Sequence, residues 1–175
     1  MDKINRSIQI KVLIIVVLVL ISSMIIFFLV SDSGVRKFEN DSFKIIYEDN
    51  WKVLEKEGNL LTLVHKSGSK YMIRLIDLQG EHRRDDLSII IEEILSQVEQ
   101  DNPNYRLVNK EQAIISKNKY DGYHYLYETD ELQSMIMICK KNDKVYILNY
   151  IAEHVKFDIL LDSVLDMTWN FEILR

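Results

Sequence analysis

Residues that could do acid–base, metal or nucleophilic chemistry are few and scattered in this 175-residue chain. There are four histidines, His65, His82, His124 and His154, and one cysteine, Cys139. None of them shows the His-x-x-His or Cys-x-x-Cys spacing typical of metal ligands, and one cysteine excludes a disulfide framework. The chain also lacks a G-x-S-x-G elbow, a P-loop and a glycine-rich phosphate loop. We therefore expect no cofactor, no metal and no enzymatic activity.

One polar loop concentrates charged residues ahead of a predicted helix. Glu81 and His82, with two aspartates nearby, could supply three metal ligands, but adjacent side chains seldom converge on one ion. Arg83 and Arg84 could bind an anion or an acidic partner, although isolated surface charges are more often simply solvated. We interpret the loop as solvated surface. The candidate partner-binding residues are Trp51, Glu81, His82, Arg83 and Arg84.

Tyrosine is unusually frequent in the second half of the chain. Such rings could stack on sugars or form the centre of an interface, because tyrosine is enriched at interfaces. The preferred interpretation is that Tyr123, Tyr125 and Tyr127 cover one sheet face beneath a helix, since aromatic residues suit strands. Cys139 shares a strand face with two methionines, which predicts a buried thiol. The tyrosines considered are Tyr120, Tyr123, Tyr125, Tyr127, Tyr146 and Tyr150.

The charge balance is acidic. The chain has 22 Lys and Arg against 27 Asp and Glu, for a formal net charge of −5. Nucleic-acid-binding domains usually show a basic face, so we expect no nucleic-acid partner.

A run of apolar residues near the N-terminus predicts a membrane segment. Val12–Val30 contains no charge, proline or glycine, and at 1.5 Å per residue it reaches about 28 Å, close to the hydrocarbon thickness of a bilayer. A cleaved signal peptide is the alternative, but the run is longer than a usual signal core, which favours an uncleaved anchor. The basic residues that precede it favour a cytoplasmic N-terminus. The predicted organisation is a tail (1–11), a transmembrane helix (12–30), a linker (31–41) and an extracytoplasmic domain (42–175).

Hydrophobic periodicity predicts an α+β domain after the linker. Alternation indicates strands at 43–48, 51–54, 60–66 and 70–78, then at 105–108, 112–116, 122–128, 134–140 and 144–152. An apolar stripe from Leu87 to Val98 predicts a helix that Asp85 or Asp86 caps and Asn102-Pro103 ends. A second helical stripe runs from Phe157 to Leu165. Period-two spacing of Met167, Trp169, Phe171 and Ile173 predicts a short extended tail packed on the core.

The order of these elements resembles the PsbP-like domain, a fold shared by DcrB-type bacterial envelope proteins and the Ran-binding Mog family. The resemblance covers residues 42–174. It rests on Phe43–Tyr47 leading into Asn50–Val53, the helix after a strand pair, Gly122-Tyr123 opening a strand, Tyr146–Ala152 followed by Phe157, and Trp169–Phe171. The family usually has a proline before the first tryptophan, where this chain has Glu48-Asp49. The resemblance implies a central antiparallel sheet with helices on both faces, and no shared active site.

Together these observations favour a non-catalytic, single-pass protein of the bacterial cell membrane. Its C-terminal domain would lie outside the cytoplasm and act as an interaction or assembly module, as an accessory subunit of a membrane complex. One alternative is a ligand-binding accessory protein of a transporter that uses a cleft between sheet and helix. Another is a hydrolase with an unrecognised site.

Overall fold

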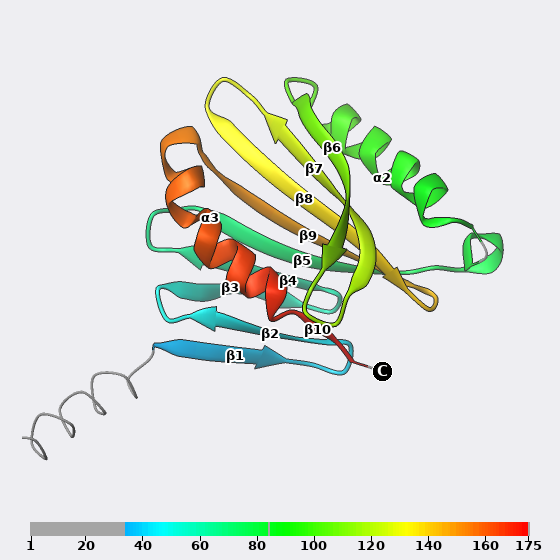
Figure 1. Cartoon of the computed structure of the whole chain (residues 1–175), viewed down its shortest axis with the longest axis horizontal. Helices are drawn as coiled ribbons and strands as arrows, with labels where there is room; N and C mark the ends of the chain where they lie inside the picture. The colour runs from blue at the N-terminus through cyan, green and yellow to red at the C-terminus, as the bar shows by residue number, and fades with distance from the viewer. Residues whose placement is uncertain (1–33, 84, 175) are drawn as a thin grey trace, which may run out of the picture. The chain divides into compact units, whose positions relative to one another are not determined.

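The computed structural model describes residues 34–83 and 85–174. This part of the chain folds into two β-sheets, two α-helices and one 3-10 helix (Figure 1). The strands are β1 (Val35–Glu39), β2 (Phe43–Glu48), β3 (Trp51–Glu57), β4 (Leu60–His65), β5 (Lys70–Asp77), β6 (Arg106–Ile115), β7 (Tyr120–Glu128), β8 (Leu132–Lys141), β9 (Lys144–Glu153) and β10 (Glu172–Ile173). The helices are η1 (Gly80–Arg83), α2 (Leu87–Asp101) and α3 (His154–Trp169).

The larger sheet has seven strands in the order β3-β4-β5-β9-β8-β7-β6. All its neighbouring strands pair antiparallel, so the predicted hairpin of β4 and β5 and the predicted meander of β7, β8 and β9 are both confirmed. A smaller antiparallel sheet, β1-β2-β10, lies beyond β3. The two predicted pieces at 105–108 and 112–116 belong to one strand, β6, which a register shift between Leu107 and Asn109 interrupts.

Alternation along the strands sorts side chains into two cores, one on each face of the larger sheet. On β8, Met135, Met137 and Cys139 belong to the core that α3 and the smaller sheet cover. The residues between them, Ile136 and Ile138, belong to the core beneath α2. Because successive strand residues point to opposite faces, α2 and α3 lie on opposite sides of the sheet. The expected α+β fold, an antiparallel sheet flanked by helices, is confirmed.

The tyrosines are divided between these two cores. Tyr125 and Tyr127 are fully buried beneath α2, with Tyr123 partly buried beside them, as predicted. Tyr146 and Tyr150 instead lie in the α3-side core, so the tyrosines do not form a single cluster. Their burial identifies them as core residues.

Helix α2 begins and ends where the sequence predicts. Asp86 occupies the N-cap position, although its side chain makes no capping hydrogen bond. Asn102 is the C-cap, and its backbone N–H bonds to the carbonyl of Val98. The following Pro103 has no backbone N–H with which to continue the helix.

Two sequence-based predictions about the ends of the domain are wrong. Part of the predicted linker forms β1, which pairs antiparallel with β2 and buries Phe38. Met167 and Trp169 belong to the last turn of α3 and not to an extended tail, and only Glu172–Ile173 pairs as a strand with β2. The two-residue spacing of Met167 and Trp169 does not mark a strand here. Met167 and Thr168 are both buried as part of the inward face of α3, whereas Trp169 is exposed.

Neither α2 nor α3 combines the length and the apolar character that crossing a bilayer requires. The apolar run at 12–30, with its predicted membrane-spanning role, lies outside the described residues.

The two tryptophans are expected to contribute very differently to stability. Trp51 has no exposed surface, and its ring lies 5.2 Å from that of His65, whereas Trp169 is 53% exposed. We expect Trp51→Ala to lower the free energy of unfolding by about 3–5 kcal/mol and Trp169→Ala by less than about 1 kcal/mol. Urea unfolding of both variants measures this, and equal losses would contradict the assignment of Trp51 to the core.

His65 makes folding sensitive to mild acid. Burial is the main cause that lowers its pKa, with the positive charge of Lys66 second. The unfolded state therefore binds a proton more readily than the folded state, and stability falls as the pH drops below about 6.5. We expect His65→Gln to reduce the loss of unfolding free energy between pH of about 7.5 and about 5.5, measured in urea. An unchanged loss would show that other groups control this pH range.

Candidate functional site

The loop of predicted partner-binding residues forms η1, between β5 and α2. Lys140 of β8 holds it in place: its Nζ donates to the carbonyl oxygens of Arg83 at 3.1 Å and Asp85 at 2.8 Å. The side chain of Glu81 and all of Arg84 lie outside the described residues.

The described charges of this loop are paired locally. The His82 Nδ1 lies 2.9 Å from the Asp85 carboxylate. Arg83 donates from Nε to the carbonyl of Leu78 at 3.2 Å, and the same nitrogen lies 3.7 Å from the carboxylate of Asp143. Among the described residues, no three His, Cys, Asp or Glu side chains lie close enough to share a metal ion. His82 and Arg83 thus remain exposed, ordered surface residues.

Trp51 is not available to a partner. The structure buries it completely beneath α3, where its Nε1 donates to Ser163 Oγ at 3.3 Å. The prediction that it is a partner-binding residue is wrong, because a ring with no exposed area cannot be contacted from outside. It also lies far along the chain, and on another element, from the η1 loop with which the sequence grouped it.

A second, stronger candidate surface lies between α3 and the end of β6, and we call it the α3 groove. It is a hollow of about 370 Å³ whose floor includes Met135 and Met137. Three large apolar side chains of its lining are strongly exposed: Ile114 at 62%, Trp169 at 53% and Leu165 at 45%. Trp is the residue most enriched among energetically dominant interface contacts. Exposed apolar side chains around a hollow are typical of a surface that a partner covers.

One polar group of the α3 groove lacks a partner. His124 Nδ1 lies 2.9 Å from the carboxylate of Glu111 on the neighbouring strand. The other ring nitrogen, Nε2, is buried and makes no hydrogen bond to any described residue. When Nδ1 carries the proton and donates to Glu111, Nε2 of the neutral ring is an acceptor. Because Nε2 itself has almost no exposed surface, a partner in the groove does not reach it in this structure.

Acidic residues line the exposed face of α3 beside this groove. Asp158, Asp162 and Asp166 follow one another at intervals of four residues, and all three are exposed. Spacing of four places them along one side of the helix, and Asp166 also lines the groove. Sequence reasoning missed this surface because it ended the helix near Leu165. Continuing the helical spacing to Trp169 would have found it.

The Cys139 thiol is not a candidate nucleophile. It is fully buried, and burial raises its pKa to about 12, so the reactive thiolate is scarce at neutral pH. The prediction of a buried small apolar residue is confirmed.

No protein-family model matches the chain, and no curated protein matches its sequence. Solved structures do resemble it. Cyanobacterial PsbP (CyanoP) from Synechocystis sp. PCC 6803 aligns with a TM-score of 0.61 at 9% identity, over 81% of this chain and 93% of that protein. The described domain has a PsbP-like fold. LpqN, described as involved in cell envelope biogenesis of Mycobacterium tuberculosis, aligns with a TM-score of 0.58 at 11% identity, over 83% of this chain and 94% of LpqN.

These similarities concern the fold of the PsbP-like domain. At 9–11% identity the side chains at any site are free to differ, so the function has to be argued from this chain's own residues.

The order of the η1 loop is expected to depend on Lys140. Replacing it by methionine removes both hydrogen bonds to the loop carbonyls while keeping a similar side-chain volume. We expect Lys140→Met to raise amide hydrogen exchange in residues 80–86 by about ten-fold, since local opening is limited by such contacts. Lys141→Met is the matched control, because the Lys141 Nζ bonds instead to the carbonyl of Ile173. Equal exchange in the two variants would contradict this role.

Proposed function

We propose that the chain is a non-catalytic, single-pass protein of the bacterial cell envelope, of the DcrB type. Val12–Val30 would hold it in the membrane, and residues 42–175 would lie outside the cytoplasm as an interaction module of a membrane complex. The apolar run and its flanking charges support the anchor and its orientation. The PsbP-like fold, which LpqN shares, is compatible with an envelope role.

The observation that carries the interaction role is the α3 groove. Trp169 and Leu165 of α3 and Ile114 of β6 together leave a large apolar surface exposed. Leaving such side chains in water costs hydrophobic free energy that a bound partner would recover, at roughly 25 cal/mol per Å². The groove is therefore the surface of the domain best suited to a lasting protein contact.

The chemistry of the groove specifies the kind of partner. An apolar side chain of the partner would pack against Trp169 above the methionine floor. The row of aspartates on α3 favours a partner with Lys or Arg beside that apolar anchor. We propose a polypeptide of this apolar–basic kind as the partner.

Site-directed photocrosslinking in cells tests this function. A photoreactive amino acid at Leu165 or Ile114 should give a discrete crosslinked partner, and the same amino acid at Ile89 should not. Ile89 is the matched control because it is an equally exposed aliphatic residue, at 49%, on α2 and so on the opposite face of the sheet. Crosslinks that are absent everywhere, or equally strong from Ile89, would contradict the proposal.

Substitution of the groove should separate binding from folding. We expect Trp169→Glu to reduce partner recovery by at least about ten-fold, as for an interface hot spot, with little change in thermal midpoint because the ring is half exposed. Ile89→Glu should leave recovery unchanged.

The proposed orientation has its own test. A reporter fused after Arg175 should be active only outside the cytoplasm, and cytoplasmic activity would overturn the proposed orientation.

A further inference from the structure

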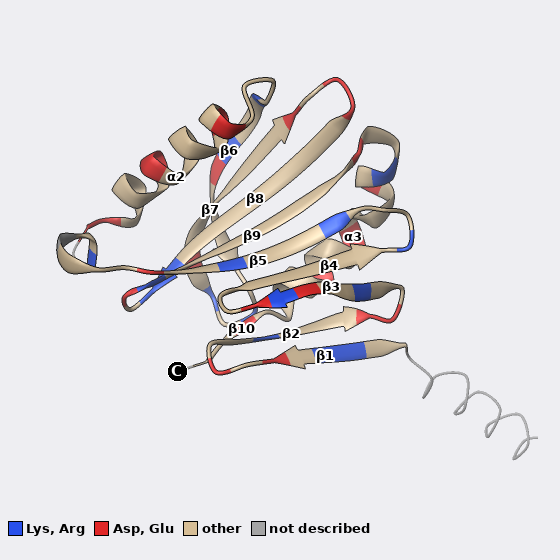
Figure 2. Ribbon diagram, turned by 180° about the vertical axis from the view of Figure 1, so that it is seen from behind, with Lys and Arg blue, Asp and Glu red and all other residues tan. Residues whose placement is uncertain are grey.

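One helix cannot cover a seven-stranded sheet. Six intervals of about 4.8 Å separate the outer strands by about 29 Å, whereas a helix with its side chains is only about 10 Å wide. On the α3 side, the smaller sheet covers the part of the larger sheet that α3 leaves open. On the other side, α2 packs over β7 and β8, and Figure 2 shows β4, β5 and β9 with no helix in front of them.

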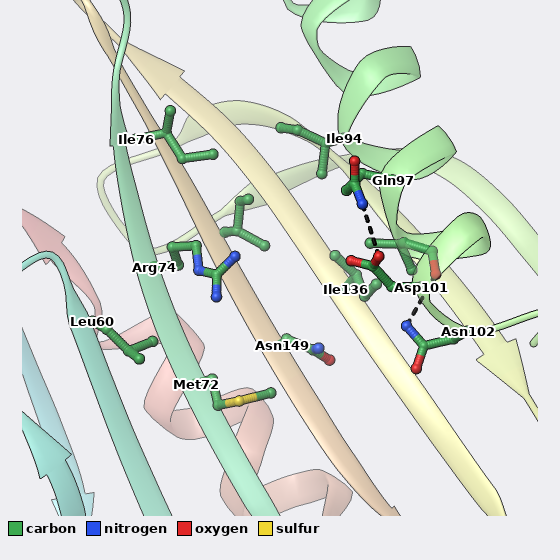
Figure 3. A pocket seen from close by; sticks show the side chains of 12 residues that line it. Leu60, Met72, Arg74, Ile76, Ile94, Gln97, Asp101, Asn102, Ile136 and Asn149 are labelled. Atoms are coloured by element: carbon green, nitrogen blue, oxygen red, sulfur yellow. Dashed lines mark hydrogen bonds between the residues drawn. The ribbon is translucent and has the colours of Figure 1, made fainter.

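A cleft runs along the edge of the part of the sheet that α2 covers. Its first hollow, of about 260 Å³, lies between the C-terminal half of α2 and strands β5 and β9 (Figure 3). Its walls are mostly aliphatic, and Met72, Ile76 and Ile147 from the sheet and Ile94 and Val98 from the helix are only partly buried. These side chains leave apolar area in contact with water, which an apolar ligand would cover.

Two polar groups on the sheet side of this hollow are hydrogen-bond donors without partners among the described residues. Arg74 projects from β5 into it, and the Arg74 guanidinium makes no hydrogen bond or ion pair with any described residue (Figure 3). Asn149 accepts a hydrogen bond from Ser134 at its Oδ1, at 2.9 Å, which leaves its NH₂ group to donate.

The acceptors on the helix side are partly engaged. The carboxylate of Asp101 accepts from Gln97 at 2.8 Å. The carbonyl of Val98 accepts from both the backbone and the side chain of Asn102, each at 3.0 Å. The sheet side of the hollow thus offers a cationic donor and an amide donor without partners in the described part of the chain, which together suit an anionic group. Asp101 adds one negative charge on the helix side.

The cleft continues along α2 as a second hollow of about 310 Å³. It shares Ile76 and Ile94 with the first and extends to Leu78, Ile90 and His82. Ile90 and Val98 are eight residues apart on the helix, so the two hollows span about 12 Å along it. An elongated apolar chain fits this length better than a compact ring does.

We propose that this cleft binds a small amphiphile with an anionic head and an acyl chain. The head accepts hydrogen bonds from Arg74 and Asn149, and the chain lies along α2, over Ile76 and Ile94, toward Ile90. The site is separate from the α3 groove, because it lies on the opposite face of the sheet, and it does not depend on the function proposed for that groove. A free fatty acid and an anionic membrane lipid carry the same chemistry.

Photolabelling of the full-length protein in nanodiscs tests the site. The probe is a decanoate derivative with a diazirine at the end of its chain, and labelled peptides are located by mass spectrometry. We expect labelling of peptides from α2 and β5 that excess decanoate suppresses. Decyltrimethylammonium has the same chain and the opposite charge, and it should not compete.

Two variants test the head-group contact. Arg74→Gln should reduce this labelling by about ten-fold, as expected for the loss of one charge-assisted hydrogen bond, while Arg74→Lys retains most of it. Asp101→Asn should increase labelling, because it removes the negative charge opposite Arg74. Arg74 is exposed, so its replacement leaves the fold intact, and circular dichroism checks this.

Labelling that Arg74→Gln leaves unchanged, labelling that both competitors suppress equally, or labelling that is absent from α2 and β5 would each overturn the proposal. Nanodiscs with and without phosphatidylglycerol then distinguish the sources of the ligand. Competition by phosphatidylglycerol identifies a membrane lipid, and competition by free decanoate alone identifies a soluble fatty acid.

Discussion

The pairing of β5 with β9 is the constraint on which the rest of the domain depends. It joins the strands β3-β4-β5 to the meander β6-β7-β8-β9 through eight consecutive residue pairs, from Lys70 opposite Ile151 to Asp77 opposite Lys144. A slip of one residue would move every side chain of β5 to the other face of the sheet. Tyr71, Ile73 and Leu75 would then leave the core, so burial fixes the register strongly.

This register also positions the sheet residues of the cleft beside α2. It sends Met72, Arg74 and Ile76 to the side where α2 covers only part of the sheet. The α3 groove is lined instead by residues of β6, β7, β8 and α3, and the end of α3 leaves Ile114 exposed. Each surface is therefore a strip of sheet that a single helix is too narrow to cover. A wider helical layer would have removed both.

The PsbP-like fold can support different functions. The uncovered strips of sheet follow from the architecture, whereas the side chains that line them are set by the sequence. In this chain, one strip has unpaired donors among aliphatic side chains and the other has tryptophan beside aspartates. The first suits an anionic amphiphile and the second an apolar–basic polypeptide. The two surfaces lie on opposite faces, so both could be occupied at once.

The sequence by itself determined the α+β class, the ends of α2 and most strands, because period two, period 3.6 and Asn102-Pro103 are local signals. It also predicted that Cys139 and the tyrosines of β7 are buried. Tertiary structure decided what local pattern could not. Trp51 and Trp169 look alike in sequence, yet one is buried beneath α3 and the other exposed at its end. The sequence does not indicate a role for Arg74, because exposure and pairing depend on residues distant along the chain. The pairing of β5 with β9 places it near Asn149, opposite the end of α2.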